Sequence, residues 1–150
     1  TYDARLRHAL EIASEEGLAY EFYLTSLPGA HPNTAILELT GEQGGTCRMV
    51  GASIGGGNII VTNINGLEVQ FTGQYNTLIV LHQDTPGVIA AVTNTMAYSG
   101  ANIGNFRLSR PQKGGEAVMT IEVDGDVSDS MISFLRQLPH ITGVVLVRAI

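Results

Sequence analysis

Apolar positions in the second half of the chain recur with two different periods. The stretch "TLIVLHQ" at residues 77–83 is an almost continuous apolar run, and "EAVMTIEVD" at residues 116–124 alternates between apolar and polar positions. Both patterns are typical of β-strands. Residues 86–99 instead carry a helical stripe that consists of Val88, Ile89, Val92 and Met96. Pro86 suits the first turn of that helix, where its missing N–H costs nothing.

Three further segments complete this half of the chain. Strands are expected at residues 102–110, "NIGNFRLSR", and at residues 143–150, "GVVLVRAI". Residues 128–138 predict an amphipathic helix with Ser128 as its N-cap. Its inward side chains are Met131, Leu135 and Leu138. The order is β-α-β-β-α-β within about 75 residues, which is typical of a ferredoxin-like split βαβ domain.

The first half of the chain predicts one helix and an antiparallel sheet. Apolar residues from Leu6 to Ala13 have helical spacing, and Gly17 stands where a helix-ending glycine would. A strand is expected at residues 18–24, "LAYEFYL", and a loop at residues 25–33. Four more strands are expected at residues 34–40, 46–54, 58–64 and 67–73. Asn65-Gly66 between the last two is a strong signal for a type I′ hairpin turn.

The predicted fold class is therefore α+β in two parts. Residues 1–73 form an N-terminal helix plus an antiparallel sheet, and residues 76–150 form the ferredoxin-like domain, with a hinge at residues 73–76. The chain has no initiator Met and opens inside a helical pattern. We therefore expect it to be part of a longer protein.

Charge and hydropathy narrow the classes of partner. Eight basic and fourteen acidic residues give a net charge of −6, which repels phosphate, so nucleic acid is not an expected partner. No apolar run approaches the ~20 residues of a membrane span, and no signal peptide is visible. We expect a cytoplasmic protein with no membrane partner.

Cys47 is the single cysteine of the chain. A lone Cys forms no internal disulfide and cannot by itself hold a zinc or an iron–sulfur site. Cys47 lies in the strand expected at residues 46–54, where a small core residue and a reactive thiol are both open interpretations. We favour the interpretation of Cys47 as a small core residue.

The first candidate site is the loop "HQDTPG", which joins the strand at residues 77–83 to the following helix. His82 and Asp84 there lie near a helix N-terminus, whose free N–H groups attract an anion such as a carboxylate. Asn102 begins the next strand at the far end of that helix, so it can approach this loop only across a dimer. The alternative is that His82 and Asp84 are ordinary loop residues.

Two further candidates lie in the first half. In "HPNT", His31 and Asn33 can orient a small polar substrate, His31 can move a proton, and Thr34 follows them. In "GASIGGGNI" at residues 51–59, three glycines can bring backbone N–H groups close to an anion. The alternatives are an ordinary turn for the first motif and a tight connection between strands for the second. Neither a P-loop nor a dinucleotide-binding turn is present in the sequence.

The stretch "LIVLHQDTPGVIAAVTNTMAYSGANIGNFRLSR" resembles an ACT domain, the small regulatory module of amino-acid metabolism, and the match covers residues 76–150. In serine-binding ACT domains a His and an Asn of the loop and an Asn of the second strand hold the amino acid at a dimer interface. His82 and Asn102 match the first and the last of these, and Asp84 replaces the loop Asn. The resemblance implies an effector site in which Asp84 holds the ammonium group of an amino acid or a monovalent or divalent cation.

Taken together, "HPNTAILELTG", "VGASIGGGNIIVTNINGLEVQFTG" and the ACT-like half resemble the β subunit of bacterial iron–sulfur-dependent L-serine dehydratase. The resemblance implies conversion of L-serine to pyruvate and ammonia, with a 4Fe-4S cluster on a separate α subunit. It also implies that His31, Asn33 and Thr34 contact the active site or its interface, that the ACT domains form a homodimer, and that this chain alone is inactive.

Two other readings fit parts of the pattern. Some D-3-phosphoglycerate dehydrogenases carry a related regulatory half, in which a substrate-binding domain precedes an ACT domain. A stand-alone amino-acid sensor fits the ACT-like half but leaves "HPNT" without a role.

Overall fold

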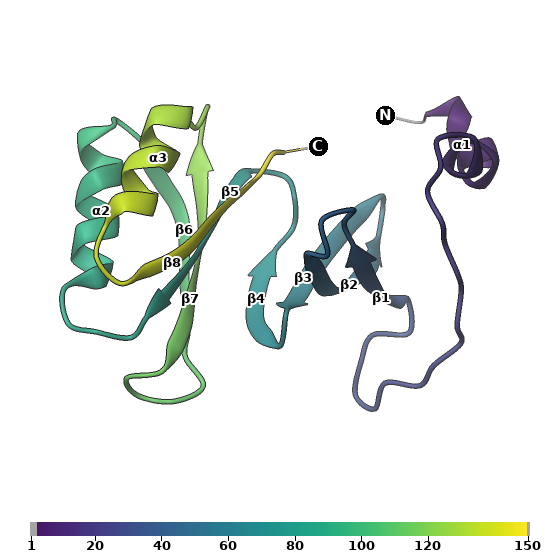
Figure 1. Cartoon of the computed structure of the whole chain (residues 1–150), viewed down its shortest axis with the longest axis horizontal. Coiled ribbons are helices and arrows are strands. Elements are labelled where there is room, and N and C mark those ends of the chain that lie inside the picture. The colour runs from purple at the N-terminus through teal and green to yellow at the C-terminus, as the bar shows by residue number, and fades with distance from the viewer. Residues whose placement is uncertain (1–2, 150) are drawn as a thin grey trace. The chain divides into compact units, whose positions relative to one another are not determined.

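The computed structural model describes residues 3–149 of the chain. These fall into two compact units, which are divided between Ala30 and His31 (Figure 1). The first unit contains a short 3₁₀ helix, η1 (Ala4–His8), that leads into α1 (Ala9–Glu15). Gly17 follows with φ of 79°, so the predicted helix and the glycine that ends it are confirmed.

The strand predicted at residues 18–24 is wrong. The structure has neither helix nor strand there, and most of its large side chains are exposed. Apolar and polar residues do alternate in this segment, and the ring centroids of Tyr20 and Phe22 lie 5.7 Å apart. A strand requires a neighbour for its N–H and C=O groups, however, and no described segment pairs with these residues.

The second unit begins with a four-stranded antiparallel sheet in chain order. Its strands are β1 (Thr34–Thr40), β2 (Thr46–Gly55), β3 (Asn58–Ile64) and β4 (Leu67–Phe71). Asn65 and Gly66 between β3 and β4 have φ of 50° and 85°. A type I′ turn requires positive φ at both central residues, so the predicted hairpin is confirmed.

A second antiparallel sheet of the same unit contains β5 (Asn76–Gln83), β6 (Asn102–Ser109), β7 (Glu116–Asp124) and β8 (Ile141–Val147). Its strand order is β6-β7-β5-β8, which is the order of the predicted ferredoxin-like domain. The helices α2 (Val88–Tyr98) and α3 (Asp129–Gln137) lie on one face of this sheet (Figure 1). The predicted α+β fold class is confirmed.

The helix-covered face carries the main hydrophobic core. Leu78 and Val80 of β5 and Met119 of β7 are fully buried there against both helices. The N-cap role of Ser128 is confirmed, since its hydroxyl accepts a 3.2 Å hydrogen bond from the N–H of Met131. The helix α2 differs from the prediction at its start.

Two residues differ from the prediction for α2: Pro86 lies outside the helix, and Ile89 is exposed. Pro86 precedes the helix, because Gly87 with φ of 91° is the N-cap and the helix begins at Val88. Ile89 belongs to the predicted buried stripe but is 41% exposed, whereas Val92 and Met96 are fully buried. Only part of the apolar stripe predicted for α2 is therefore buried against the sheet.

The other face of the second sheet packs against the first sheet. Phe71 of β4 and Val61 of β3 form a buried cluster with Ile79 of β5 and Val118 of β7. The hinge expected at residues 73–76 lies where the chain passes from the first sheet to the second, and both sheets belong to one compact unit.

Candidate functional site

His82 lies at the end of β5 on its helix-covered face, because side chains alternate along a strand and Leu78 and Val80 occupy that face. It is only 2% exposed. Its Nδ1 lies 3.4 Å from the carbonyl oxygen of Val80. Burial lowers the pKa of His82 below its ordinary value, and the Val80 carbonyl and the charge of Asp84 oppose that shift. The imidazole is therefore neutral at pH 7.

Asp84 follows in the β5–α2 loop and is bound by the hairpin between β6 and β7. Its Oδ2 accepts hydrogen bonds from Nη1 of Arg110 at 2.8 Å and from the backbone N–H of Gly114 at 3.0 Å. Its side chain is 18% exposed. The Gly114 N–H, followed by the Arg110 guanidinium, holds the pKa of Asp84 below its ordinary value. Asp84 is thus a paired carboxylate.

The backbone strengthens this contact. The Asp84 N–H donates to the carbonyl of Gly115 at 2.8 Å, and the side-chain amide of Gln83 donates to the carbonyl of Gly114. The β5–α2 loop and the β6–β7 hairpin are thus joined through Gln83, Asp84, Arg110, Gly114 and Gly115. The sequence predicted that Asp84 holds a ligand ammonium group or a cation, and this stays a prediction; within the chain Asp84 pairs with the guanidinium of Arg110.

Sequence reasoning missed Arg110. It is the last residue of the predicted strand "NIGNFRLSR", and Asp84 precedes it by 26 residues. Their contact depends on β6 and β7 forming a hairpin whose tip reaches the end of β5, which is a property of the strand order. The unmatched Asp in the loop was the one signal that a compensating charge was needed nearby.

Asn102 lies far from His82 within the chain, as its topology predicted. On β7, Asn102 is paired with Asp124 and His82 with Ala117. At about 3.3 Å per residue the strand separates them by roughly 23 Å. The Asn102 side-chain amide donates to Oδ2 of Asp124 at 2.7 Å.

A small cavity of about 140 Å³ lies near this end of β6 and β7. It is lined by Tyr75, Gly104, Asn105, Glu122 and Asp124. The Asn105 amide donates to Glu122 at 3.0 Å, so side-chain amides and carboxylates pair across the two strands.

The "HPNT" motif forms a tight turn that leads into β1. The Thr34 hydroxyl donates to the carbonyl of His31 at 2.6 Å, and the backbone N–H of Asn33 donates to Nδ1 of His31 at 3.2 Å. An Nδ1 that accepts a hydrogen bond places the proton of the neutral ring on Nε2. His31 and Asn33 are exposed and Thr34 is half-buried. Thr34 therefore fixes the turn, while His31 presents Nε2.

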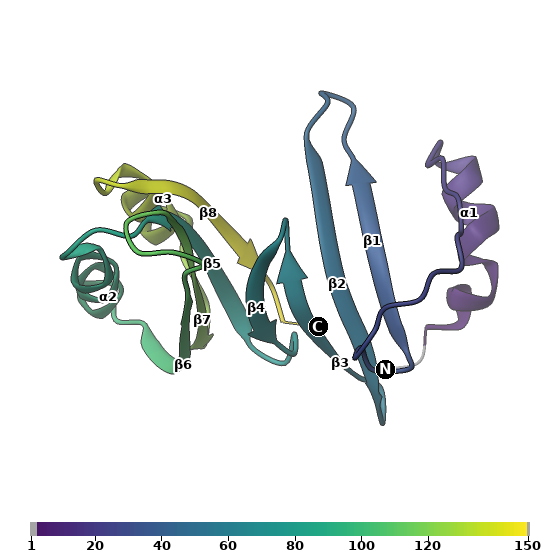
Figure 2. The same cartoon turned by 90° about the horizontal axis from the view of Figure 1, so that it is seen from below.

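The structure brings the motifs "HPNT" and "GASIGGGNI" together. The backbone N–H of Ser53 in β2 donates to the carbonyl of Asn33 at 3.0 Å, and Thr34 pairs with Ala52 across β1 and β2. Figure 2 shows these two strands side by side. The glycine turn of residues 55–57, in which every φ is positive, begins at the last residue of β2. "HPNT" and "GASIGGGNI" thus share one end of the first sheet.

Metal-ligating side chains do not gather in the described part of the chain. Residues 3–149 contain no group of three or more His, Cys, Asp or Glu that could hold a metal ion. Cys47 is half-buried in β2 opposite Leu39. Among the same residues, no helix is long and apolar enough to cross a membrane.

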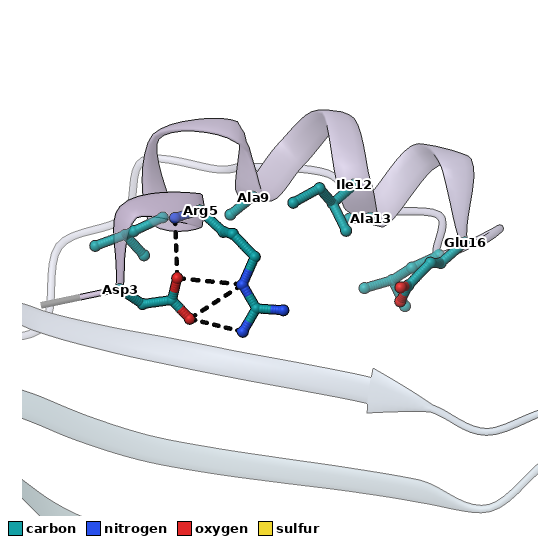
Figure 3. Close-up of a pocket in the computed structure, with 8 residues that line it drawn as sticks. Asp3, Arg5, Ala9, Ile12, Ala13 and Glu16 are labelled. Atoms are coloured by element: carbon teal, nitrogen blue, oxygen red, sulfur yellow. Dashed lines mark hydrogen bonds and ion pairs between the residues drawn. The ribbon is translucent and has the colours of Figure 1, made fainter. Parts of the chain in front are cut away.

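The first unit has an open hollow of about 400 Å³ along its helical segment (Figure 3). Ala9, Ile12 and Ala13 contribute apolar lining, and Asp3 caps η1 while its carboxylate pairs with Arg5 at 2.8 Å. None of the site residues predicted from the sequence lines this hollow.

Comparison with known proteins identifies relatives along nearly the whole chain. A family model described as an AHAS small subunit-like ACT domain matches residues 78–145. A probable L-serine dehydratase β chain of Bacillus subtilis is 38% identical over 144 residues, which is 96% of this chain and 65% of that protein. This chain is a homologue of L-serine dehydratase β chains. The predicted resemblance to L-serine dehydratase β chains and the predicted ACT-like domain are thereby confirmed.

Other relatives include a second β chain and a dehydrogenase. The L-serine dehydratase β chain of Peptoniphilus asaccharolyticus is 29% identical over 93% of this chain and 64% of its own length. The chain thus spans slightly less than two thirds of these β chains. A D-3-phosphoglycerate dehydrogenase of Bacillus subtilis is 27% identical over 91% of this chain but only 26% of its own length.

Proposed function

We propose that the chain acts in an L-serine dehydratase, as the β-chain partner of a separate catalytic α subunit that converts L-serine to pyruvate and ammonia. The observation that carries this proposal is the 38% identity over 96% of the chain, because it includes the "HPNT" sheet as well as the ACT domain. The phosphoglycerate dehydrogenase relatives are less similar.

The residues of this chain do not fit a 4Fe-4S cluster. Such a cluster needs several Cys ligands, and the chain has one, Cys47, half-buried in a strand. We therefore assign the cluster of the proposed enzyme to the α subunit. The contribution of this chain lies in binding and orientation at the interface and in regulation.

The "HPNT" turn and the adjoining glycine turn form the proposed contact with the active site. Because Nδ1 of His31 accepts from the Asn33 N–H, the neutral ring carries its proton on Nε2, which can donate a hydrogen bond or a proton to an oxygen of the substrate. Thr34 acts in support, since its hydroxyl is bound to the His31 carbonyl. The shared end of the sheet would bring backbone N–H groups and His31 to one substrate.

The ACT domain is the proposed regulatory part. Its effector site would combine His82 and Asp84 of one copy with Asn102 of a second copy, because within one chain His82 and Asn102 pair with residues near opposite ends of β7. This arrangement requires a homodimer through the ACT domains and a small amino acid or a cation as the effector. The net charge of −6 supports a protein with no nucleic-acid partner, and we propose a cytoplasmic location without a membrane partner.

The test of the lyase proposal is reconstitution. The full chain is co-expressed with a cluster-bearing L-serine dehydratase α chain under anaerobic conditions, and pyruvate formed from L-serine is measured. Pyruvate formation that requires both polypeptides is the expected result. An α chain that is fully active without this chain, or a complex that forms no pyruvate, would refute the proposal.

A second candidate is the regulatory half of a D-3-phosphoglycerate dehydrogenase, since such a relative matches 91% of the chain. It predicts that the chain, added to or fused with a dehydrogenase domain, changes NAD-linked oxidation of 3-phosphoglycerate when L-serine is present. An unchanged rate in that assay removes this candidate, and a stand-alone amino-acid sensor would then be the remaining alternative to the lyase.

A further inference from the structure

Asn58 lies directly beside the glycine turn of residues 55–57. Its side-chain amide donates to the carbonyl of Gly55 at 3.3 Å. A Cβ atom added to Gly56 would lie 3.4 Å from Nδ2 of Asn58, so the amide packs against the backbone of the turn. Three consecutive glycines have the greatest backbone freedom that a chain offers. The contact with Asn58 therefore restricts a segment that its own residue types leave free.

Gln74 holds the same Asn58 side chain through its other polar atom. The side-chain amide of Gln74 donates to Oδ1 of Asn58 at 2.9 Å, across 16 residues of sequence. Gln74 lies in the connection between β4 and β5, which carries the chain from the first sheet to the second (Figure 1). Asn58 thus binds Gly55 through its amide and Gln74 through its carbonyl oxygen. The two side chains join the glycine turn to the start of the ACT domain.

Asn76 fixes this connection to the ACT domain. Its side-chain amide donates to the carbonyl of Gly125, which follows β7, at 2.7 Å. Its Oδ1 accepts a hydrogen bond from the N–H of Ala149, which follows β8, at 3.0 Å. Gln74 and Asn76 are two residues apart and bind in different sheets. The connection between β4 and β5 is therefore a fixed point from which Gln74 can hold Asn58.

We propose that Asn58 and Gln74 are positioning residues that hold the glycine turn in the shape required for catalysis, an inference that rests on the active-site contact proposed above for this turn. Neither side chain touches the substrate, because both act through the backbone of the turn. Backbone N–H donors are effective in catalysis when their positions are fixed before the reaction. Glycines do not fix themselves, and the hydrogen bonds of Asn58 and Gln74 supply the missing restraint.

The fold itself does not depend on these two side chains. The backbones of β2 and β3 are paired up to Gly55 and Asn58. Gly56 and Gly57 have φ of 64° and 80°, as the central residues of a type I′ turn require, so the hairpin closes without help. Asn58 and Gln74 are both exposed, where most substitutions change stability little. Loss of their hydrogen bond should therefore loosen the turn and leave the protein folded.

Gln74→Glu and Gln74→Lys test the proposal, because an ionised Glu cannot donate to Asn58 whereas Lys keeps a donor. In the full chain, ¹⁵N relaxation should show the order parameters of Gly56 and Gly57 falling in Gln74→Glu from about 0.85 toward about 0.6. In the enzyme assembled with an α chain, kcat for L-serine should fall by roughly fivefold or more, with KM within about threefold of the wild type. Gln74→Lys should stay close to the wild type in both measurements.

Gln70→Glu is the matched control. It makes the same chemical change at an exposed Gln of β4 that takes no part in these hydrogen bonds, so its order parameters and its kcat should equal those of the wild type. Thermal unfolding checks that every variant is folded.

The outcomes separate this inference from the function on which it rests. Unchanged order parameters in Gln74→Glu, or an unchanged kcat in an active complex, overturn the inference and leave the proposed active-site contact standing. Equal losses in Gln74→Lys or in Gln70→Glu also overturn it, because the effect would then not come from the donor. A wild-type complex that forms no pyruvate refutes the lyase proposal instead. The relaxation measurement needs only the full chain, so it still decides whether Gln74 and Asn58 hold the turn.

Discussion

The carbonyl of Asn33 accepts a 3.0 Å hydrogen bond from the N–H of Ser53. Through this contact the "HPNT" turn is attached to β2 immediately before the glycine turn. The two motifs looked independent in the sequence, and each had an ordinary structural explanation. Their shared position makes one surface at the end of the first sheet, and that surface supports the proposed contact with an active site.

Removing the exposed polar groups of this surface should reduce activity more than stability. We expect His31→Ala or Asn33→Ala to lower pyruvate formation by the assembled enzyme by roughly tenfold or more, the usual range for a positioned acid–base group. Activity assays and thermal unfolding of the same samples provide the measurement. His8→Ala, at an exposed histidine in η1, is the matched control. Normal turnover in both variants would return "HPNT" to the role of a turn.

The chain by itself should bind no iron–sulfur cluster and should be inactive. The reason is the single half-buried Cys47. Anaerobic reconstitution with iron and sulfide, followed by absorption spectroscopy and a serine assay, is the measurement. A stable cluster chromophore accompanied by serine turnover in this chain alone would contradict the prediction.

The ACT domains should pair. The residues His82 and Asn102 lie roughly 23 Å apart along the sheet, so one chain cannot present them to one ligand. Light scattering of the full chain at high concentration should give the mass of a dimer or a larger even assembly. A strictly monomeric chain under these conditions would exclude the shared effector site.

Acidification should destabilise the chain through His82. Burial lowers its folded-state pKa below the ordinary value of 6.5. The unfolded chain therefore binds this proton more readily, and the stabilisation is complete above pH 6.5 and is lost as pH falls from there toward the folded pKa. The free energy of unfolding, measured with urea at several pH values across this range, should fall less with decreasing pH for His82→Gln than for the wild type. An equal slope, with His8→Gln as the exposed control, would show that His82 does not cause the effect.

Phe71→Ala should weaken the attachment between the two sheets. Phe71 is 4% exposed in the cluster formed with Ile79 and Val118. Loss of a buried Phe costs about 3–5 kcal/mol of unfolding free energy. Denaturant unfolding measures it, and Phe22→Ala, at a Phe that is 77% exposed, is the control and should change stability by less than about 0.5 kcal/mol. Similar losses in both variants would mean that Phe71 does not join the sheets.

Local chemistry was enough to predict most elements of the second unit. The alternation of "EAVMTIEVD" gave β7, the Asn65-Gly66 pair gave the hairpin, and Ser128 gave the start of α3. Each depends on neighbours in sequence, through strand periodicity, the positive φ of a turn or a local hydrogen bond. The strand predicted at residues 18–24 failed because pairing depends on a partner strand, which a local pattern does not specify.

The sequence by itself determined the β-α-β-β-α-β order and the burial of the strand that ends in His82, and it contains a single cysteine. The tertiary structure alone decided which charged groups meet. Asp84 and Arg110 are 26 residues apart and pair because the β6–β7 hairpin reaches the end of β5. Asn33 and Ser53 meet because β1 and β2 pair in one register. Such contacts are set by strand order and register, and these follow from how the whole chain buries its apolar faces.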